Sequence, residues 1–158
     1  MGEQRIAVEE LLLPPTVLRV ANPIIRAVLR SPLHRMLSAE MLLLHITGRR
    51  SGRTYDVPVG RHEIDGALVV SAGGAWKHNL RGGAALEVTI DGHRRRAHGE
   101  LVDDPDAVAR AFATMIGATG LRRANRLGLR INVDRSPTLD ELQVALADRG
   151  LVLLRLER

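Results

Sequence analysis

Apolar and polar residues follow two different periods along the chain. In residues 16–38, apolar residues recur at three- or four-residue spacing, which predicts a helical segment. The recurring positions are Val17, Val20, Ile24 and Val28. Pro23 and Pro32 lack the backbone donor that a helix interior uses, so we expect them to divide this segment into short helices.

The same segment is basic, because it also contains Arg19, Arg26, Arg30 and Arg35. Residues 1–40 are therefore predicted to form a basic amphipathic helical arm. The favoured interpretation is a helix that packs on the rest of the protein and leaves its basic face in water. Peripheral contact with a membrane surface, or with an acidic partner, is the alternative.

From residue 41 the pattern becomes that of short strands. Strands are predicted over residues 41–47, 54–64, 67–71, 87–91, 94–102 and 151–156. Asp65-Gly66 and Asp91-Gly92 are tight-hairpin signals, so the centre of the chain is predicted to be an antiparallel meander. Pro58 cannot donate to a strand ladder, so its strand should bulge or lie at an edge.

Two helices are predicted in the C-terminal half. Asp104 followed by Pro105 is typical of a helix start, and the pattern continues to Gly120. Thr138 and Glu141 have the spacing of a capping box, with the helix ending near residue 150. Helices around a closed antiparallel sheet give an α+β class with a small barrel in residues 41–158, and a single domain overall.

Composition narrows the classes of function. The 158 residues are 45% apolar and 26% charged, which is typical of a globular domain. Aromatic residues are only 2% and argue against a base-stacking nucleic-acid platform, while the absence of cysteine excludes disulfides and thiolate sites. With neither a cleavable signal nor a membrane-spanning run, a cytoplasmic location is expected, with peripheral membrane association left open.

The strongest local motif is TGRRSGRTYDVPVG, residues 47–60. Its turn combines three arginines with small residues, namely Arg49, Arg50, Ser51, Gly52 and Arg53. Glycines let backbone N–H groups face an anion, and guanidinium groups bind phosphate or carboxylate in a bidentate manner. The residues alone predict either an acidic-ligand site or a charged hairpin tip in water.

This turn is followed by a strand with a Val-Pro pair, a strand that ends in Ser71-Ala72-Gly73-Gly74, and the segment WKHNL at Trp76. That order resembles the deazaflavin-dependent nitroreductase family, which includes quinone reductases. The resemblance covers roughly residues 41–102 and implies a split β-barrel that binds the deazaflavin coenzyme F420. It also implies an F420H2-dependent reductase that transfers a hydride to a quinone, a nitro compound or an activated double bond.

The resemblance also implies which residues bind the coenzyme. Arg49, Arg50, Ser51, Gly52 and Arg53 would hold its acidic tail, which carries a phosphate and glutamates. The ring would lie against Val57, Pro58 and Val59 and against Ser71, Ala72 and Gly73, with Trp76 and Asn79 in the neighbouring wall. No catalytic side chain is assigned, although His78 has a suitable chemistry for a proton donor.

Several departures from the family pattern weaken the acceptor assignment more than the cofactor assignment. Gly74 and Ala75 lead directly to Trp76 without the proline-containing stretch of many relatives, and Ala72 stands where some relatives have a basic residue. Tyr55 is the only tyrosine, which excludes a tyrosine proton donor in the C-terminal half.

Alternatives remain open at this point. FMN is the closest rival cofactor, and a non-enzymatic barrel that binds F420, FMN, haem or a fatty acid is the alternative function. Metal binding is not expected, because the six histidines lack HxxH and HExxH spacing. A nucleic-acid partner is not expected either, and the residues leave both a monomer and a homodimer open.

Overall fold

The structure is a computed structural model that describes residues 6–11 and 15–158. The start of the predicted arm and residues 12–14 lie outside the described residues. By its internal contacts the chain divides into two compact units. One unit consists of residues 14–102 and 150–158, and the other of residues 1–13 and 103–149.

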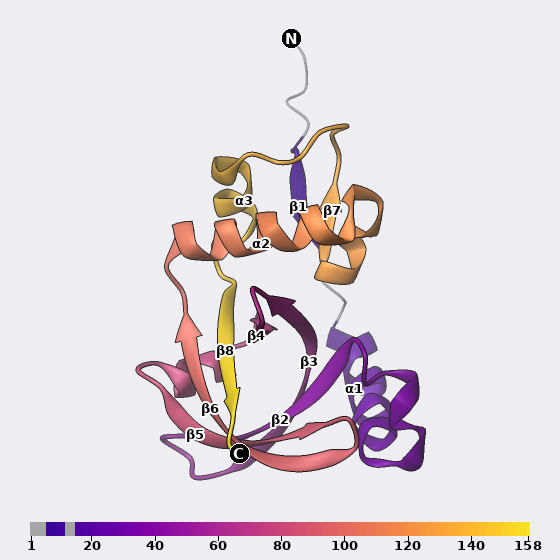
Figure 1. The fold of residues 1–158 in the computed structure, drawn as a ribbon, viewed down its shortest axis with the longest axis vertical. Helices are drawn as coiled ribbons and strands as arrows, with labels where there is room; N and C mark the ends of the chain where they lie inside the picture. The colour runs from indigo at the N-terminus through magenta and orange to yellow at the C-terminus, as the bar shows by residue number, and fades with distance from the viewer. Residues whose placement is uncertain (1–5, 12–14) are drawn as a thin grey trace. The chain divides into compact units, whose positions relative to one another are not determined.

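The first unit contains a closed six-stranded antiparallel barrel in the order β2-β3-β4-β8-β6-β5 (Figure 1). Its strands are β2 (Met41–Thr47), β3 (Thr54–Ile64), β4 (Ala67–Ala72), β5 (Ala84–Ile90), β6 (His93–Val102) and β8 (Gly150–Leu156). The 3-10 helix η2 (Ala75–Leu80) connects β4 to β5. The predicted α+β class with a split barrel is confirmed.

Two Asp-Gly turns set the register of neighbouring strands. Asp65 and Gly66 have φ values of 51° and 79°, and Asp91 and Gly92 have values of 50° and 77°. Both central positions therefore lie in the left-handed region that a two-residue hairpin turn requires. These turns confirm the predicted hairpins β3–β4 and β5–β6.

Pro58 lies in a part of β3 where its missing N–H does not cost a hydrogen bond to β4. It pairs with Leu43 of β2, whereas the pairing of β3 with β4 begins only at Arg61, opposite Val70. The first half of β3 therefore has one edge that β4 does not cover, as the proline predicted.

The barrel interior is almost entirely aliphatic. Fully buried side chains from facing strands fill it, including Leu42, Leu44, Ile46, Val70, Val88 and Val152. Inward-facing residues alternate with outward-facing ones, so Leu43, His45 and Thr47 of β2 point to the outer surface of the barrel. The outer side of β2 and β5 is thus available for polar chemistry.

The N-terminal helical segment differs from its prediction in two ways. Helix α1 (Pro15–Arg30) runs through Pro23, and only the second proline starts a new element, the 3-10 helix η1 (Pro32–Met36). Pro23 is exposed, so water can hydrate the carbonyl that loses its helical donor.

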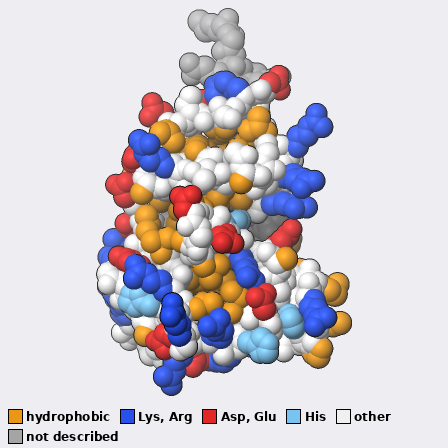
Figure 2. Space-filling model, viewed as in Figure 1, with side chains coloured by type: hydrophobic (Ala, Val, Ile, Leu, Met, Phe, Trp, Pro, Cys, Tyr) orange, Lys and Arg blue, Asp and Glu red, His pale blue; other side chains and the backbone are white. Residues whose placement is uncertain are grey.

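The orientation of α1 agrees with the favoured interpretation only in part, since Leu29 is buried and Arg19 is exposed, but other apolar residues of the helix face water. Val17, Val20 and Ile24 are 46%, 66% and 60% exposed, while the guanidinium groups of Arg26 and Arg30 contact Asp56 of β3. Figure 2 shows hydrophobic and basic side chains together on the surface over α1, at the lower right. Leu29 and two arginines therefore face the barrel, and a stripe of three apolar residues faces outward.

The second unit consists of α2 (Pro105–Thr119), the 3-10 helix η3 (Leu121–Leu127), α3 (Leu139–Ala145) and the strand pair β1 (Val8–Glu10) and β7 (Leu129–Ile131). Asp104 caps α2 by accepting the N–H of Ala107 at 2.9 Å, and the Thr138–Glu141 capping box is present. Both predicted helix starts are confirmed. The three-residue strands β1 and β7 are too short to give a periodic signal.

Candidate functional site

The arginine turn, residues 48–53 between β2 and β3, is a compact loop with its own hydrogen bonds. The N–H of Gly48 donates to the carbonyl of Arg53 at 2.8 Å, and the N–H of Gly52 donates to Gly48 at 2.9 Å. Gly52 has a φ of +68°, which suits glycine. Ser51 Oγ accepts the N–H of Arg53 at 3.2 Å, so the Ser51 hydroxyl stabilises the turn itself.

The three arginines of this turn have different environments. Arg49 donates from Nη2 to the carbonyl of Arg81 at 2.7 Å, which anchors its side chain. The guanidinium groups of Arg50 and Arg53 are exposed and make no hydrogen bond or ion pair within the described part of the chain. The backbone N–H groups of Arg50 and Ser51 likewise have no acceptor among the described residues. Together these donors could bind an anion such as phosphate or carboxylate.

Asn79 connects the arginine turn to η2. Its Oδ1 accepts the backbone N–H of Arg49 at 2.9 Å, and its Nδ2 donates to the carbonyl of Trp76 at 3.0 Å. Both ends of the amide are therefore engaged within the protein. In this structure Asn79 positions the turn, whereas direct contact of Asn79 with a cofactor remains a prediction.

The remaining predicted positions belong largely to the barrel wall. The side chains of Val57, Val59, Ala72 and Trp76 contact one hydrophobic core cluster. Contacts with a ligand at these strands would therefore come from backbone atoms, from Pro58 and Ser71, and from the exposed Gly73. The structure brings the arginine turn and η2 together directly, through Asn79.

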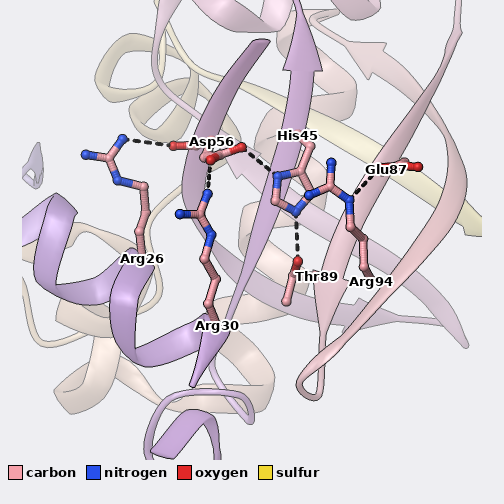
Figure 3. A network of polar contacts seen from close by, with 7 residues as sticks. All are labelled: Arg26, Arg30, His45, Asp56, Glu87, Thr89 and Arg94. Carbon is pink, nitrogen blue, oxygen red and sulfur yellow. Dashed lines mark hydrogen bonds and ion pairs between the residues drawn. The ribbon is translucent and has the colours of Figure 1, made fainter. Parts of the chain in front are cut away.

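A polar network on the outer face of the barrel has no counterpart among the predicted site residues (Figure 3). His45 is 4% exposed, with Nδ1 at 2.6 Å from Asp56 Oδ1 and Nε2 at 2.7 Å from Thr89 Oγ1. Asp56 also forms an ion pair with Arg30 of α1 and accepts Arg26 Nη1 at its carbonyl, 3.5 Å away. One carboxylate thus joins the buried histidine to the helix.

Protonation states follow from these partners. An ionised Asp56 can only accept hydrogen bonds, so Nδ1 of His45 carries the proton, and Nε2 accepts from the Thr89 hydroxyl. Burial, with the nearby positive charges of Arg94 and Arg30, lowers the pKa of His45 to about 4. The hydrogen bond from Arg94 lowers the pKa of Glu87, with smaller contributions from the charges of Arg94 and Arg96.

Hairpin register could have revealed this network from the sequence. Since Thr47 pairs with Thr54 across the arginine turn, His45 must face Asp56. A histidine within the apolar run MLLLHIT and an aspartate in TYDVPVG are the sequence features that indicate this His45–Asp56 pair. Thr89 and Arg30 could not be added, because they come from other parts of the fold.

A groove of about 450 Å³ lies on the same outer face. Thr47 and Thr54, which flank the arginine turn, line one part of it. Its other lining residues are His45, Ala85, Leu86, Glu87, Arg94, Arg96, Ala97 and Glu157. The groove thus extends from the arginine turn across β2 and β5 to β6.

The described residues contain no cluster of three or more histidine and carboxylate side chains that could hold a metal ion. Within that same part of the chain, no helix has the length and apolar character needed to cross a bilayer.

Comparison with known proteins adds family evidence to this geometry. The family model described as F420H(2)-dependent quinone reductase matches residues 19–133, which is more than half of the chain. Comparison with curated proteins gave no match.

Among solved structures, the chain is similar to the conserved hypothetical protein Rv2991 from Mycobacterium tuberculosis. The two are 16% identical with a TM-score of 0.44, and the match covers 99% of this chain and 87% of the other. Since the family match includes the barrel strands β2 to β6, the arginine turn and η2, this chain belongs to the F420H(2)-dependent quinone reductase family, a family of oxidoreductases that use F420H2.

Proposed function

We propose that this protein reduces a quinone with F420H2 and holds the acidic tail of the coenzyme at the arginine turn. The observation that carries the proposal is the pair of guanidinium groups at Arg50 and Arg53, which are exposed and have no partner in the described residues. Beside them, the N–H groups of Arg50 and Ser51 are open to an acceptor. Phosphate and carboxylate groups match this donor set.

The protein's own residues would mainly position the coenzyme. F420H2 supplies a hydride when bound, and reduction of a quinone to a hydroquinone also requires one proton. The turn would bind the tail, while backbone at Pro58 and Gly73 and the wall formed by Trp76 would orient the ring. His78 is exposed, with Nδ1 at 3.2 Å from Arg81 Nη2, and its role as proton donor remains a prediction.

Nitro compounds and activated double bonds are included in the proposal as further acceptors, because they also accept a hydride. The family match supports quinone as the first acceptor to test. FMN remains the comparison cofactor for binding experiments, since its single phosphate would engage fewer of these donors than the phosphate and glutamates of F420.

Fluorescence titration with oxidised F420 tests the cofactor site. We expect an Arg50→Gln/Arg53→Gln variant to bind F420 roughly tenfold or more weakly, because each lost charge-assisted contact contributes on the order of 1 kcal/mol at an exposed site. Arg110→Gln is the matched control, since it removes an exposed arginine from α2. Unchanged affinity in the double variant, or tighter binding of FMN than of F420 by the wild type, would refute the assignment.

Peripheral membrane contact through α1 is part of the proposal, because quinones with long apolar tails partition into bilayers. The exposed stripe of Val17, Val20 and Ile24 supports it, together with Leu33 and Met36 of η1, which are 60% and 77% exposed. Arg19 and Arg35 are exposed on the same two elements and would suit anionic lipid headgroups.

A further inference from the structure

Another cavity, of about 460 Å³, lies at the end of the barrel that carries the two Asp-Gly turns. Its apolar part is formed by Leu68, Ile90 and Leu156, which belong to the hydrophobic core cluster of the barrel or pack against it. Its polar rim is formed by Arg61, His62, Glu63 and Asp91. We call this cavity the barrel mouth. Its lining residues all belong to the first unit.

Strand register shows that Glu63 faces the barrel mouth from the inner side of β3. Glu63 pairs with Leu68 of β4, and Leu68 pairs with Leu154 of β8. Paired residues of neighbouring strands project from the same side of a sheet, and both leucines contact the barrel core. The carboxylate of Glu63 therefore lies beside an apolar surface at the end of β3.

The charges around the barrel mouth do not cancel. Arg61 donates from Nη1 to the carbonyl of Ser38 and to Asp91 Oδ1, both at 2.8 Å, so its positive charge is already paired. Glu63 is exposed and makes no hydrogen bond or ion pair with any described residue. Burial lowers the pKa of His62, so this imidazole adds no positive charge near neutral pH. The barrel mouth thus combines apolar side chains with one carboxylate that lacks a counterion.

We propose that the barrel mouth binds a small organic ammonium ion, with its apolar chain against Leu68, Ile90 and Leu156 and its charge at Glu63. An ammonium group has the positive charge and the N–H donors that the carboxylate of Glu63 can accept. A carboxylate ligand would be repelled by Glu63. The site is separate from the arginine turn, because the turn precedes the first residue of β3 and Glu63 is near the last.

Titration of the full chain with three probes of equal chain length, followed by 15N NMR, tests this proposal. The probes are hexylammonium, hexanol and hexanoate, which differ in charge. We expect saturable shifts of the Gly66 and Ile90 amide signals with hexylammonium, since both residues line the cavity. Hexanol should bind more weakly than hexylammonium, and hexanoate the most weakly. Butylammonium should bind about tenfold more weakly than hexylammonium, because two fewer methylene groups are buried.

Two variants show whether the charge of Glu63 is responsible. Glu63→Gln keeps the size of the side chain and should bind hexylammonium about threefold or more weakly, with a smaller preference over hexanoate. Glu100→Gln is the matched control, because Glu100 is exposed on the outer face of β6, opposite Leu153. It should bind all three probes as the wild type does, although it loses the same charge.

Several results would overturn the proposal. One is the absence of a saturable shift with hexylammonium. Equal affinity for hexylammonium and hexanoate, or unchanged affinity in Glu63→Gln, would show that the carboxylate does not select the ligand. Shifts at Gly52 of the arginine turn without shifts at Gly66 and Ile90 would place the bound ammonium ion outside the barrel mouth. None of these results bears on F420 binding, which is measured separately.

Discussion

At the scale of single residues, His45 is the clearest case of a polar group whose state is set by its surroundings. It is buried on the outer side of β2 and hydrogen-bonded at both nitrogens. Burial and two nearby arginines lower its pKa to about 4, so it is neutral in the folded protein at physiological pH. Because the pKa of His45 differs between the folded and unfolded chain, the free energy of unfolding depends on pH.

The sign of this linkage predicts acid sensitivity. Between a pKa of about 6.5 in the unfolded chain and about 4 in the folded one, the unfolded state binds the extra proton, so stability falls as pH falls through this window. We expect His45 to account for about 2 kcal/mol of lost unfolding free energy between pH 7 and pH 5. Urea unfolding of the wild type and of His45→Gln at both pH values measures the difference.

His93→Gln is the control, because His93 is exposed at the start of β6. The His93→Gln variant should lose as much unfolding free energy between pH 7 and pH 5 as the wild type. In His45→Gln that loss should be smaller by about 2 kcal/mol. The same pH dependence in all three proteins would show that His45 is not the titrating group.

Asp56 supports a second prediction, since it holds both His45 and Arg30. Asp56→Asn keeps an acceptor for His45 but loses the charge that pairs with Arg30. We expect a loss of about 1–2 kcal/mol in unfolding free energy and faster amide hydrogen exchange in α1.

Asp91→Asn provides the comparison, because it removes an ion pair with Arg61 in which the carboxylate is more exposed, 60% against 26% for Asp56. Asparagine also tolerates the positive φ at this position. The loss of unfolding free energy in Asp91→Asn should be about 0.5 kcal/mol or less. Equal costs for the two variants, with unchanged exchange in α1, would contradict a special role of Asp56 in holding the helix.

At the scale of elements, sequence patterns predicted the strands better than the orientation of α1. The Asp-Gly turns, Pro58 and the strand periods predicted the barrel hairpins, because these signals are local. The pattern predicts that the apolar face of α1 packs inward, and Leu29 does so, yet Val20 and Ile24 are exposed. Arg26 and Arg30 contact Asp56 of the barrel instead. A helical period shows that one face is apolar, but not what covers it.

The exposed stripe predicts binding to membranes. A Val20→Asp/Ile24→Asp variant should co-sediment with anionic lipid vesicles at least about tenfold less than the wild type, because two apolar anchors are replaced by charges that anionic headgroups repel. Val144→Asp is the matched control, since Val144 of α3 is 80% exposed and lies outside the stripe. Absence of vesicle binding by the wild type, or equal loss in the control, would argue against this contact.

At the scale of the whole molecule, the family and the cofactor followed from motifs, whereas the outer-face network required the fold. TGRRSGR and WKHNL are continuous in sequence, and the structure joins them through the contact of Asn79 with Arg49. The network of His45, Asp56, Thr89 and Arg30 combines three strands and a helix. The Asp56–His45 pair follows from hairpin register, but the other two partners depend on barrel closure and on the docking of α1.

Anaerobic oxidation of F420H2 by a soluble quinone tests most directly whether this protein is a quinone reductase that binds its coenzyme at the arginine turn. The reaction is followed by absorbance with the wild type and the Arg50→Gln/Arg53→Gln variant. We expect quinone-dependent turnover by the wild type. In the variant, KM for F420H2 should rise roughly tenfold or more, with kcat within about a factor of two, because these arginines would bind ground and transition state alike. No quinone-dependent oxidation by the wild type, or an unchanged KM in the variant, would contradict this assignment.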